Sequence, residues 1–302
     1  MLIILYGGVG PTINNKNQML IDGRATCGYR EYAKNFGHII YMTPQNVSLH
    51  WEHSIPDPKN VIEFINKHPD AIVWAIKRNK LRDQQILRKI KNKKIYYSCN
   101  SQNMYNEFCN VSLVDTPERI AKNAKLWFKG KDPNYWQPRI KKDFDYILIG
   151  RRGDKNELYF LQQLTKKISN KRKILWLGGI KFKKKVKTHH EVTYTKFMPQ
   201  SEVRDNISLA HVGVLFTQIK TEGFPQTFLE MTMAGVPVIY NEGAPRNKFY
   251  FHKSNCRMCH KKQLIETAEE LLKNHNSTLC RQAAIGNYSL ERSYKHILSL
   301  LK

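Results

Sequence analysis

Short apolar runs alternate with helix-like stretches along the whole chain, and this pattern limits the folds open to it. Each apolar run has the length of a β-strand, and most are followed by a segment with helical character. Strands that alternate with helices favour a parallel sheet with helices on both faces. The sequence therefore predicts an α/β protein with doubly wound parallel sheets.

The expected elements fall into two sets. In the first half, the strands are Leu2–Tyr6, His38–Met42, Ala71–Ile76, Lys94–Ser98 and Val111–Val114, and the helices are Arg24–Phe36, Pro58–Lys67, Asn79–Asn92, Gln102–Phe108 and Thr116–Ala124. In the second half, the strands are Tyr146–Ile149, Ile174–Leu177, Val192–Tyr194, Val212–Phe216, Val236–Tyr240 and Cys256–Cys259, and the helices are Lys155–Ser169, Ser201–Ala210, Pro225–Ala234, Leu264–Lys273, Ser277–Ile285 and Leu290–Leu301.

One segment interrupts the alternation and divides the chain. Gly130–Lys142 contains Asp-Pro, Gln-Pro and mixed charges, as an interdomain linker does. With 302 residues, the chain is long enough for two ordinary domains with separate cores. We expect an N-terminal domain over residues 1–138, a C-terminal domain over 139–288 and a last helix over 289–302.

The chain is strongly basic. It has 50 Lys and Arg against 25 Asp and Glu, a net charge of +25, with clusters at Lys77–Lys94 and Lys181–Lys187. Such a charge attracts DNA or an anionic membrane surface. Codon bias of an AT-rich genome explains many lysines, but it does not explain the deficit of acids. Since no apolar run spans a membrane and no secretory signal is visible, we expect a cytoplasmic protein.

Six cysteines are expected to be reduced thiols in such a protein. Cys256-Arg-Met-Cys259-His260 has the spacing of a c-type haem attachment site, and the nearby His252 suggests zinc as a second reading. The same residues also fit a short buried strand in which the cysteines are small core residues. We favour the strand, and we expect no metal ion.

The stretch that begins at Glu222 carries the most specific functional pattern. Glu222 lies in a Gly/Pro loop, and Glu230 follows eight positions later in the expected helix. At 3.6 residues per turn, Phe228, Leu229 and Met233 can be buried while Glu230 projects from another face. The N–H groups of the loop and the positive end of the helix form an anion site. Carboxylates beside an anion site suit a sugar nucleotide.

This pattern resembles the signature of the retaining glycosyltransferases of family 4, which have the GT-B fold. The likeness rests on the two glutamates, the Gly-Phe-Pro between them and the Ala-Gly-Val-Pro-Val that follows. It implies two Rossmann-like domains that face each other across a cleft, with Leu290–Leu301 crossing back onto the first domain. It also implies transfer of a sugar from a nucleotide diphosphate, with UDP as the expected nucleotide, without a metal or other cofactor.

The resemblance also assigns roles to single residues. Lys155 and one of two arginines, Arg151 or Arg152, would hold the diphosphate, because fixed cations stabilise the charge that develops on this leaving group. Glu222 would bind the transferred sugar and Glu230 the ribose. The other expected donor contacts are Gly7 and Gly8 after the first strand, Phe197 and Met198 against the nucleobase, and the segment Gly223, Phe224, Pro225, Gln226 and Thr227, in which the N–H groups of Phe224, Gln226 and Thr227 face sugar or phosphate.

On the acceptor side the chain departs from the family, which often has a histidine after the fourth strand. Here the stretch reads Tyr97-Ser98-Cys99-Asn100-Ser101, so Ser98 or Asn100 takes that place. No glycosidase-like carboxylate pair is required, because in this family the leaving phosphate is thought to deprotonate the acceptor hydroxyl.

The basic charge leaves several acceptors open. The leading hypothesis is a hydroxymethylated base of phage or viral DNA, with Trp127, Phe128, Tyr135 and Trp136 stacking on an extruded base. Packing in the core and linker is the alternative role of these aromatic residues. A lipid-linked or envelope glycan beside an anionic membrane is the second hypothesis. The third is a non-catalytic nucleic-acid-binding protein on the same scaffold.

Overall fold

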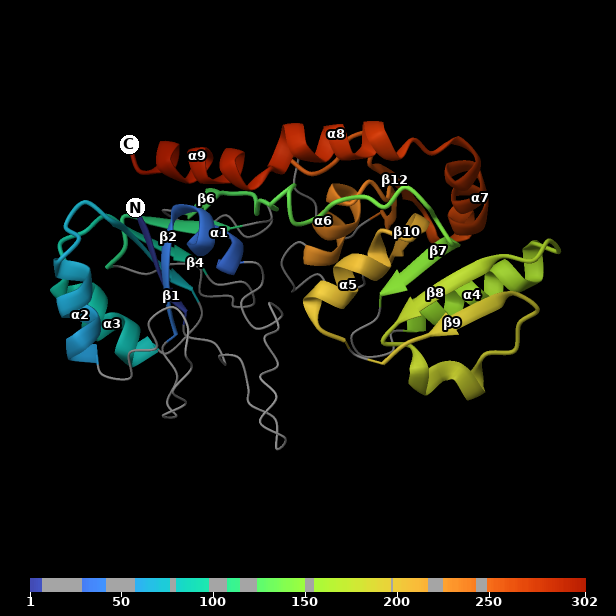
Figure 1. Ribbon diagram of the computed structural model, residues 1–302, viewed down its shortest axis with the longest axis horizontal. Helices are drawn as coiled ribbons and strands as arrows, with labels where there is room; N and C mark the ends of the chain where they lie inside the picture. Colours follow the sequence, from blue (N-terminus) through green and yellow to red (C-terminus); the bar gives the residue numbers. More distant parts are fainter. Residues whose placement is uncertain are drawn as a thin grey trace. The chain divides into compact units, whose positions relative to one another are not determined.

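The computed structural model describes residues 1–6, 29–41, 58–76, 80–97, 108–114, 124–149, 155–196, 198–216, 225–242 and 249–302. They form two compact units (Figure 1). Unit 1 contains described residues of Met1–Gly130 and Leu290–Lys302, and unit 2 contains those of Lys131–Lys220 and Pro225–Ser289. The units divide after Gly130 and after Ser289, whereas the domain borders were expected after residues 138 and 288.

Unit 1 is built on a parallel sheet with the strand order β2-β1-β3-β4-β5-β6. Its strands are β1 (Leu2–Tyr6), β2 (Gly37–Tyr41), β3 (Ile72–Ile76), β4 (Lys94–Tyr97), β5 (Val111–Val114) and β6 (Ala124–Leu126). The chain adds β2 on one side of β1 and then β3 to β6 on the other. This reversal of direction is the mark of a doubly wound sheet.

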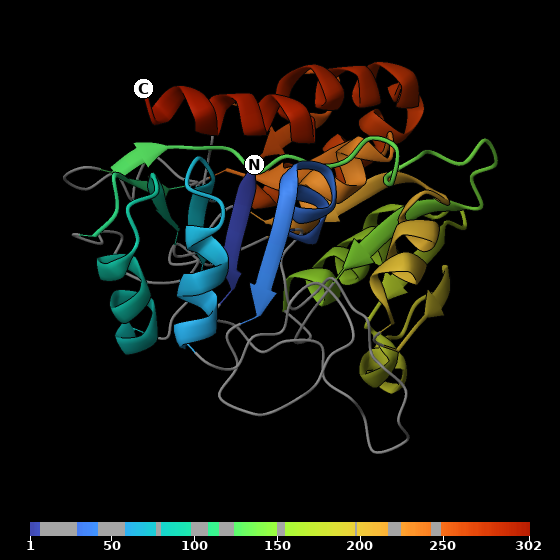
Figure 2. The ribbon, with the colours of Figure 1, turned by 60° about the vertical axis from the view of Figure 1, so that its left-hand side comes forward.

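Alternate residues of the unit 1 strands enter cores on opposite faces of the sheet. Leu2 and Ile4 pack with α1 (Tyr29–Phe36) and α9 (Leu290–Leu300). Ile3 and Leu5 of the same strand pack on the other face, which is covered by α2 (Pro58–Asn66) and α3 (Lys80–Lys89) (Figures 1 and 2). The period of two follows from the pleat of the strand.

Three of the four aromatic residues that were expected to stack on a DNA base are buried instead. Trp127 is inaccessible to solvent and packs edge-on against Trp74 and Tyr97 in the core of unit 1. Phe128 and Trp136 are buried as well. A buried ring cannot stack on an extruded base, so the alternative role, packing, is the correct one for these three residues.

Buried hydrogen bonds join α9 to the rest of unit 1. The Ser293 hydroxyl donates to the Phe128 carbonyl at 2.5 Å and accepts from the Trp127 indole at 3.2 Å. The Tyr32 hydroxyl donates to Ser293 at 2.6 Å and accepts from the Gly130 N–H. Since all these groups are satisfied in the core, they fix the helix in one register.

Unit 2 repeats the same plan with the strand order β12-β11-β10-β7-β8-β9, again all parallel. Its strands are β7 (Phe144–Ile149), β8 (Lys173–Leu177), β9 (Glu191–Tyr194), β10 (Ala210–Leu215), β11 (Val238–Asn241) and β12 (Cys256–Cys259). Its helices are α4 (Lys155–Lys167), α5 (Gln200–Ile207), α6 (Gln226–Met233), α7 (Leu264–Asn274) and α8 (Ser277–Tyr288), with short 3₁₀ turns η2 (Ile180–Lys185) and η3 (Lys261–Gln263).

The helices of unit 2 cover both faces of its sheet. Apolar residues of α4 and α7 form one core with β7, β8 and β10. Helix α6 packs against α5, α8 and β11. Two parallel sheets with this winding confirm the doubly wound α/β fold that the sequence predicts.

Some element boundaries differ from those expected. Ala124 begins the edge strand β6 rather than ending a helix; the rest of the helix expected at Thr116–Ala124, and most of Gln102–Phe108, lie outside the described residues. The third helix ends at Lys89, because Asn92 turns its amide to the carbonyls of His68, Pro69 and Ala71. Each difference comes from a hydrogen bond or pairing with a distant segment.

The CxxCH segment is a strand, as expected. Cys256 and Cys259 are buried in β12, and the described cysteines are free thiols. Among the described residues, no group of three or more His, Cys, Asp or Glu side chains is arranged to hold a metal ion. In the same part of the chain, no helix is long and apolar enough to cross a membrane.

Candidate functional site

The sheet of unit 2 has a reversal point between its two central strands. β7 and β10 are neighbours, but the chain continues from β7 to β8 on one side and from β10 to β11 on the other. In open α/β sheets, ligands bind outside the carboxyl ends of the strands at such a point. The start of α4, which follows β7, and the start of α6, which follows β10, are therefore the candidate site.

The start of α4 is tied to the end of β10. The helix begins at Lys155, and the Asn156 side chain donates a hydrogen bond to the carbonyl of Phe216 at 2.9 Å, directly after β10. Asn156 and Glu157 are both buried in the first turn. This contact places Lys155, an expected ligand of the diphosphate, in the helical turn at the reversal point.

The start of α6 has no side-chain cap among the described residues. Pro225 precedes the helix with φ −64° and ψ 126°. The first N–H groups of a helix have no carbonyl partner within it, so Gln226 and Thr227 present donors at its positive end. These are two of the residues whose N–H groups were expected to face sugar or phosphate.

Two glycines fix α6 against the sheet. A Cβ at Gly213 in β10 would lie 2.4 Å from the sulfur of Met231, so a larger residue there would require the Met231 side chain to move. Gly235, with φ 73°, ends α6. Its N–H donates to the carbonyl of Thr232, and the N–H of Val236 donates to the carbonyl of Met231. This is the Schellman arrangement, in which glycine is favoured because φ is positive.

The amide nitrogen and oxygen of the Gln226 side chain are buried, although the residue as a whole is partly exposed. In the part of the chain that the structure describes, neither its amide nitrogen nor its amide oxygen has a hydrogen-bond partner. An unpaired buried amide costs about 1–3 kcal/mol, and native proteins contain few of them. A ligand that completes the hydrogen bonds of Gln226 would remove this cost.

Helix α6 buries the residues that its repeat predicts. Phe228, Leu229 and Met233 are inaccessible to solvent. Glu230 lies on another face but is also largely buried, with 8% exposure, and it has a partner that the sequence does not suggest. The ammonium group of Lys131 lies 3.0 Å from its Oε1.

Lys131 is the functional candidate that the sequence pattern misses. It belongs to the expected linker, yet it is inaccessible to solvent, and its ammonium group lies 5.1 Å from the ring centre of Trp136. Lys131 bonds only one oxygen of Glu230, and the side chain of Glu230 keeps 10% of its surface. The pair therefore orients a carboxylate whose second oxygen is free to accept a hydrogen bond.

Most other expected site residues lie outside the described residues, namely Gly7, Gly8, Ser98, Asn100, Arg151, Arg152, Phe197, Glu222, Gly223 and Phe224. Met198 is described: its sulfur accepts from the Asn206 amide at 3.6 Å, just before α5. Gly7 and Gly8 directly follow β1, which with β3 forms the reversal point of unit 1. The structure thus brings together Lys155, Pro225, Gln226 and Thr227 at one edge of unit 2, with Glu230 in the second turn of α6.

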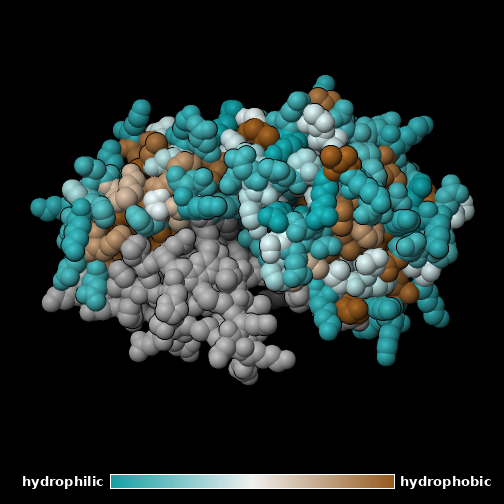
Figure 3. All heavy atoms as spheres, viewed as in Figure 1, coloured by the Kyte–Doolittle hydropathy of each residue, from teal (hydrophilic) through white to brown (hydrophobic). Residues whose placement is uncertain are grey.

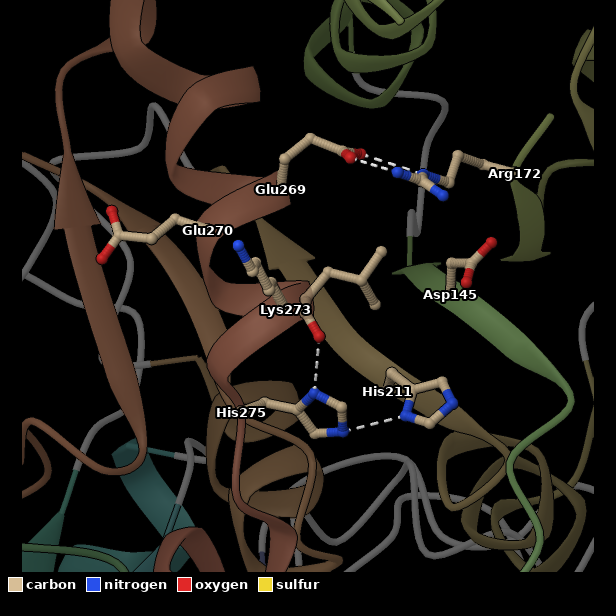
Figure 4. Close-up of a pocket in the computed structure, with 8 residues that line it drawn as sticks. Asp145, Arg172, His211, Glu269, Glu270, Lys273 and His275 are labelled. Carbon is tan, nitrogen blue, oxygen red and sulfur yellow. Dashed lines mark hydrogen bonds and ion pairs between the residues drawn. The ribbon is translucent and has the colours of Figure 1, made fainter. Parts of the chain in front are cut away.

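Unit 2 also has a cavity of about 650 Å³ at the opposite edge of its sheet (Figure 4). Asp145 and His211 line it from the amino-terminal parts of β7 and β10. Arg172 forms a two-bond ion pair with Glu269, which also accepts from the Tyr146 hydroxyl. Arg172 and Glu269 thus bond each other within this cavity, which lies away from the carboxyl ends of the strands.

Two histidines complete this cavity. His275 Nδ1 lies 2.8 Å from the Leu272 carbonyl and must donate to it, so Nε2 of the neutral ring accepts from Nδ1 of His211 at 2.9 Å (Figure 4). Burial lowers the pKa of His211, and the nearby His275 and Lys142 lower it further, while Asp145 opposes them. Since its ring nitrogens bond each other and a backbone carbonyl, we regard the pair as structural.

Comparison with known proteins gives the fold its name. The chain matches no protein-family model and no curated protein. It is similar in structure to a glycosyltransferase from Rickettsia africae, with a TM-score of 0.68 at 14% identity over 100% of this chain and 98% of that one. Anabaena Alr3699/HepE in complex with UDP and glucose gives a TM-score of 0.70 at 11% identity over 99% and 98%. The chain has the GT-B fold.

A third solved structure extends the comparison. The lipopolysaccharide outer core galactosyltransferase WaaB gives a TM-score of 0.63 at 11% identity, over 100% of this chain and 99% of that one. Since these matches cover the whole chain, the GT-B fold that the sequence predicts is confirmed for both units. At such low identity the likeness establishes the fold, and function must be argued from the site.

Proposed function

We propose that the chain is a cytoplasmic glycosyltransferase that takes a sugar from a nucleotide diphosphate, with UDP as the nucleotide, and transfers it to an acceptor hydroxyl. The observation that carries this proposal is that the two central strands of the unit 2 sheet, β7 and β10, are followed by helices that begin at Lys155 and at Gln226, at the reversal point of the sheet. Similar structures support it, since Anabaena HepE is described in complex with UDP and with UDP-glucose.

The proposed diphosphate site combines side-chain cations with backbone donors. Lys155 and either Arg151 or Arg152 neutralise the two phosphates, and the N–H groups of Gln226 and Thr227 bond their oxygens. Helix starts and fixed cations stabilise the charge that develops on the leaving group as the glycosidic bond breaks. Since these groups stabilise the negative charge of the diphosphate, the reaction needs no metal ion. Activity should therefore persist in excess EDTA.

The two glutamates bind the two sugars of the donor in this proposal. Glu230 accepts from the ribose hydroxyls with the oxygen that Lys131 leaves free, and Lys131 is a positioning residue for it. Glu222 binds hydroxyls of the transferred sugar. Gly7 and Gly8 let the backbone approach the donor, while Phe197 and Met198 contact the base.

Transfer proceeds with retention of configuration, in keeping with the Glu-x7-Glu pattern of family 4. The acceptor hydroxyl attacks the anomeric carbon from the face that the diphosphate leaves, and its proton passes to the departing phosphate oxygen. The α-linked donor thus gives an α-linked product and free UDP. Proton NMR of the first product formed checks this, because a β-linked product would contradict it.

For the acceptor, we propose a hydroxyl of a lipid-linked or envelope glycan. The hypothesis of hydroxymethylated DNA was based on the basic charge and on four aromatic residues that could stack on a base, and three of these residues are buried. The basic charge fits either acceptor, but WaaB, a structural neighbour, is described as a lipopolysaccharide outer core galactosyltransferase. Ser98 or Asn100 remains the proposed contact on the acceptor side.

A mass-spectrometric screen tests the proposal. UDP-sugars are incubated with the protein and either lipid extracts or duplex DNA containing hydroxymethylated bases. We expect a mass increase of one sugar on a lipid-linked glycan, and Glu222→Ala should abolish both transfer and slow hydrolysis of the donor. Glycosylated DNA would instead select the other acceptor. Absence of donor hydrolysis and transfer with every UDP-sugar would favour a non-catalytic protein.

A further inference from the structure

A run of lysines forms a short helix at the carboxyl edge of the unit 2 sheet. η2 directly follows β8, within a segment, residues 158–190, that contains ten lysines and arginines and no acid. We call Ile180–Lys187 the lysine platform. Its side chains Lys183, Lys184, Lys185 and Lys187 are exposed, and among the described residues none of them makes an ion pair.

The platform is fixed rigidly to the sheet. The ring of Phe182 stacks on Trp176 with centroids 5.2 Å apart and an interplanar angle of 2°. A Cβ at Gly179 would lie 2.4 Å from the Trp176 ring, so glycine permits this close approach. The N–H of Ile180 donates to the Thr195 carbonyl at 3.2 Å. A run of lysines that served only for solubility would need no such anchoring.

An apolar side chain lies among the lysines. Ile180 is 40% exposed, and in a 3₁₀ helix it shares one side with Lys183, three residues on. In Figure 3, apolar atoms lie among hydrophilic ones at the position of η2, the short unlabelled helix beneath β9 in Figure 1.

A second exposed isoleucine provides a comparison. Ile140 is fully exposed, but the cations beside it are balanced by acids: Arg139 lies 3.9 Å from Asp205, and Lys141 lies 3.6 Å from Asp143. In the lysine platform, by contrast, the exposed isoleucine lies beside lysines that form no ion pair with any described acid.

We propose that the lysine platform docks unit 2 on an anionic lipid surface. Lysines near such a surface are attracted to the phosphates of its headgroups, and an isoleucine beside them can enter the headgroup region. A surface for single-stranded nucleic acid interleaves cations with exposed aromatic rings, whereas Phe182 is stacked inward on Trp176. Charge and apolar character together favour lipid over nucleic acid.

The docking proposal names the surface on which the acceptor of the proposed glycosyltransferase lies, so it rests on the proposed function. The platform lies at the same edge of the unit 2 sheet as the starts of α4 and α6. Vesicle binding needs no donor sugar, so a failure of docking and a failure of sugar transfer are separate results.

Co-sedimentation with vesicles tests the proposal. The full chain is mixed with vesicles of phosphatidylcholine, with or without phosphatidylglycerol. The test variant carries Lys183→Gln, Lys184→Gln and Lys185→Gln. The control carries Lys166→Gln, Lys171→Gln and Lys273→Gln, which remove the same charge from exposed sites at the opposite edge of the sheet. Ile180→Asp is compared with Ile140→Asp, and circular dichroism establishes that each variant is folded.

The wild type should bind only vesicles that contain phosphatidylglycerol. At about 1 kcal/mol per lysine, or roughly fivefold each, the platform variant should bind about 100-fold more weakly, and the control less than about tenfold more weakly. Ile180→Asp should weaken binding more than Ile140→Asp. Equal losses in the two triple variants, or equal binding of the wild type to vesicles of phosphatidylcholine alone, would overturn the proposal. Binding of duplex DNA is measured in parallel. A platform variant that loses DNA binding but keeps vesicle binding would also overturn the proposal.

Discussion

Lys131 and Glu230 show how one residue pair decides both stability and the shape of the candidate site. Both charges are largely shielded from water, and the Lys131 ammonium group lies 3.0 Å from Glu230 Oε1. A buried ion pair adds little net stability, because desolvation offsets the attraction. Removal of Lys131 alone costs more, since the Glu230 carboxylate would then be buried without this cation.

Lys131→Met should therefore destabilise the fold by about 3–5 kcal/mol. Urea unfolding followed by circular dichroism measures this change. The matched control is Lys295→Met, because Lys295 and Glu291 form an exposed pair at 2.7 Å, and exposed pairs contribute little to stability. A loss below about 1 kcal/mol in Lys131→Met would mean that Glu230 does not depend on Lys131.

The buried histidines make stability depend on pH. Burial lowers the pKa of His211 and of His190 below the ordinary value of about 6.5. As the pH falls through this value, the unfolded chain takes up protons that the folded chain resists, so folding stability decreases. We expect a lower urea midpoint at pH 5.5 than at pH 7.5, and a smaller difference in His211→Asn. An unchanged difference in the variant would contradict this assignment.

At the scale of single elements, the ends of the helices determine where the site lies. Helix α6 begins with the N–H groups of Gln226 and Thr227, which no described side chain caps, and it ends in the glycine turn at Gly235. A Cβ added at Gly235 would lie 2.9 Å from the Ser277 carbonyl and would force a positive φ on alanine. Gly286 in α8 is exposed, and nothing lies within 4 Å of its added Cβ.

The same substitution should thus have opposite effects at the two glycines. Gly235→Ala should destabilise the fold by about 1–2 kcal/mol, because it places a side chain in the left-handed region. Gly286→Ala should stabilise it by about 0.5–1 kcal/mol, because alanine favours the helix and restricts the unfolded chain. Thermal unfolding of both variants is the measurement. Equal effects of the same sign would show that the α6 turn is not as described.

Strands and helices with strong periodic patterns were predictable from sequence. β1, β5 and β12 have the expected bounds, and the other expected elements that lie within the described residues begin or end within a few residues of them. Errors occur where a hydrogen bond outside the strand or helix decides its boundary. β11 begins at Val238 rather than Val236, because the N–H of Val236 bonds the Met231 carbonyl in the turn that ends α6.

Elements without a periodic signal were not predictable. β6 is an edge strand of three residues, too short to alternate, and its segment reads as helix. η2 consists largely of lysines, so its sequence suggests only a solvated loop. Its position depends on Trp176 and Gly179, which sequence spacing does not bring together with Phe182.

At the scale of the whole molecule, the fold class and the helix of the candidate donor site could be derived from the sequence. The Glu222 motif predicts that α6 buries Phe228, Leu229 and Met233, and it does. Lys131 could not be found in this way. A lysine in a mixed-charge linker suggests exposure, and its partner Glu230 lies 99 residues along the chain.

The central claim is that the start of α6 binds the diphosphate of a nucleotide sugar. Pro225 already has the extended ψ that a following proline requires, so Gln226→Pro should leave the helix intact while it removes one N–H. Gln226→Leu removes the side-chain amide but keeps that N–H. Comparing the two variants separates the backbone donor from the side chain.

Calorimetric titration of UDP into the wild type and both variants, with EDTA present, is the most direct test. A hydrogen bond to a charged group contributes about 1.5–3 kcal/mol, so Gln226→Pro should bind UDP at least about tenfold more weakly than Gln226→Leu. Equal affinity of the two folded variants, or no binding of UDP to the wild type, would contradict the account.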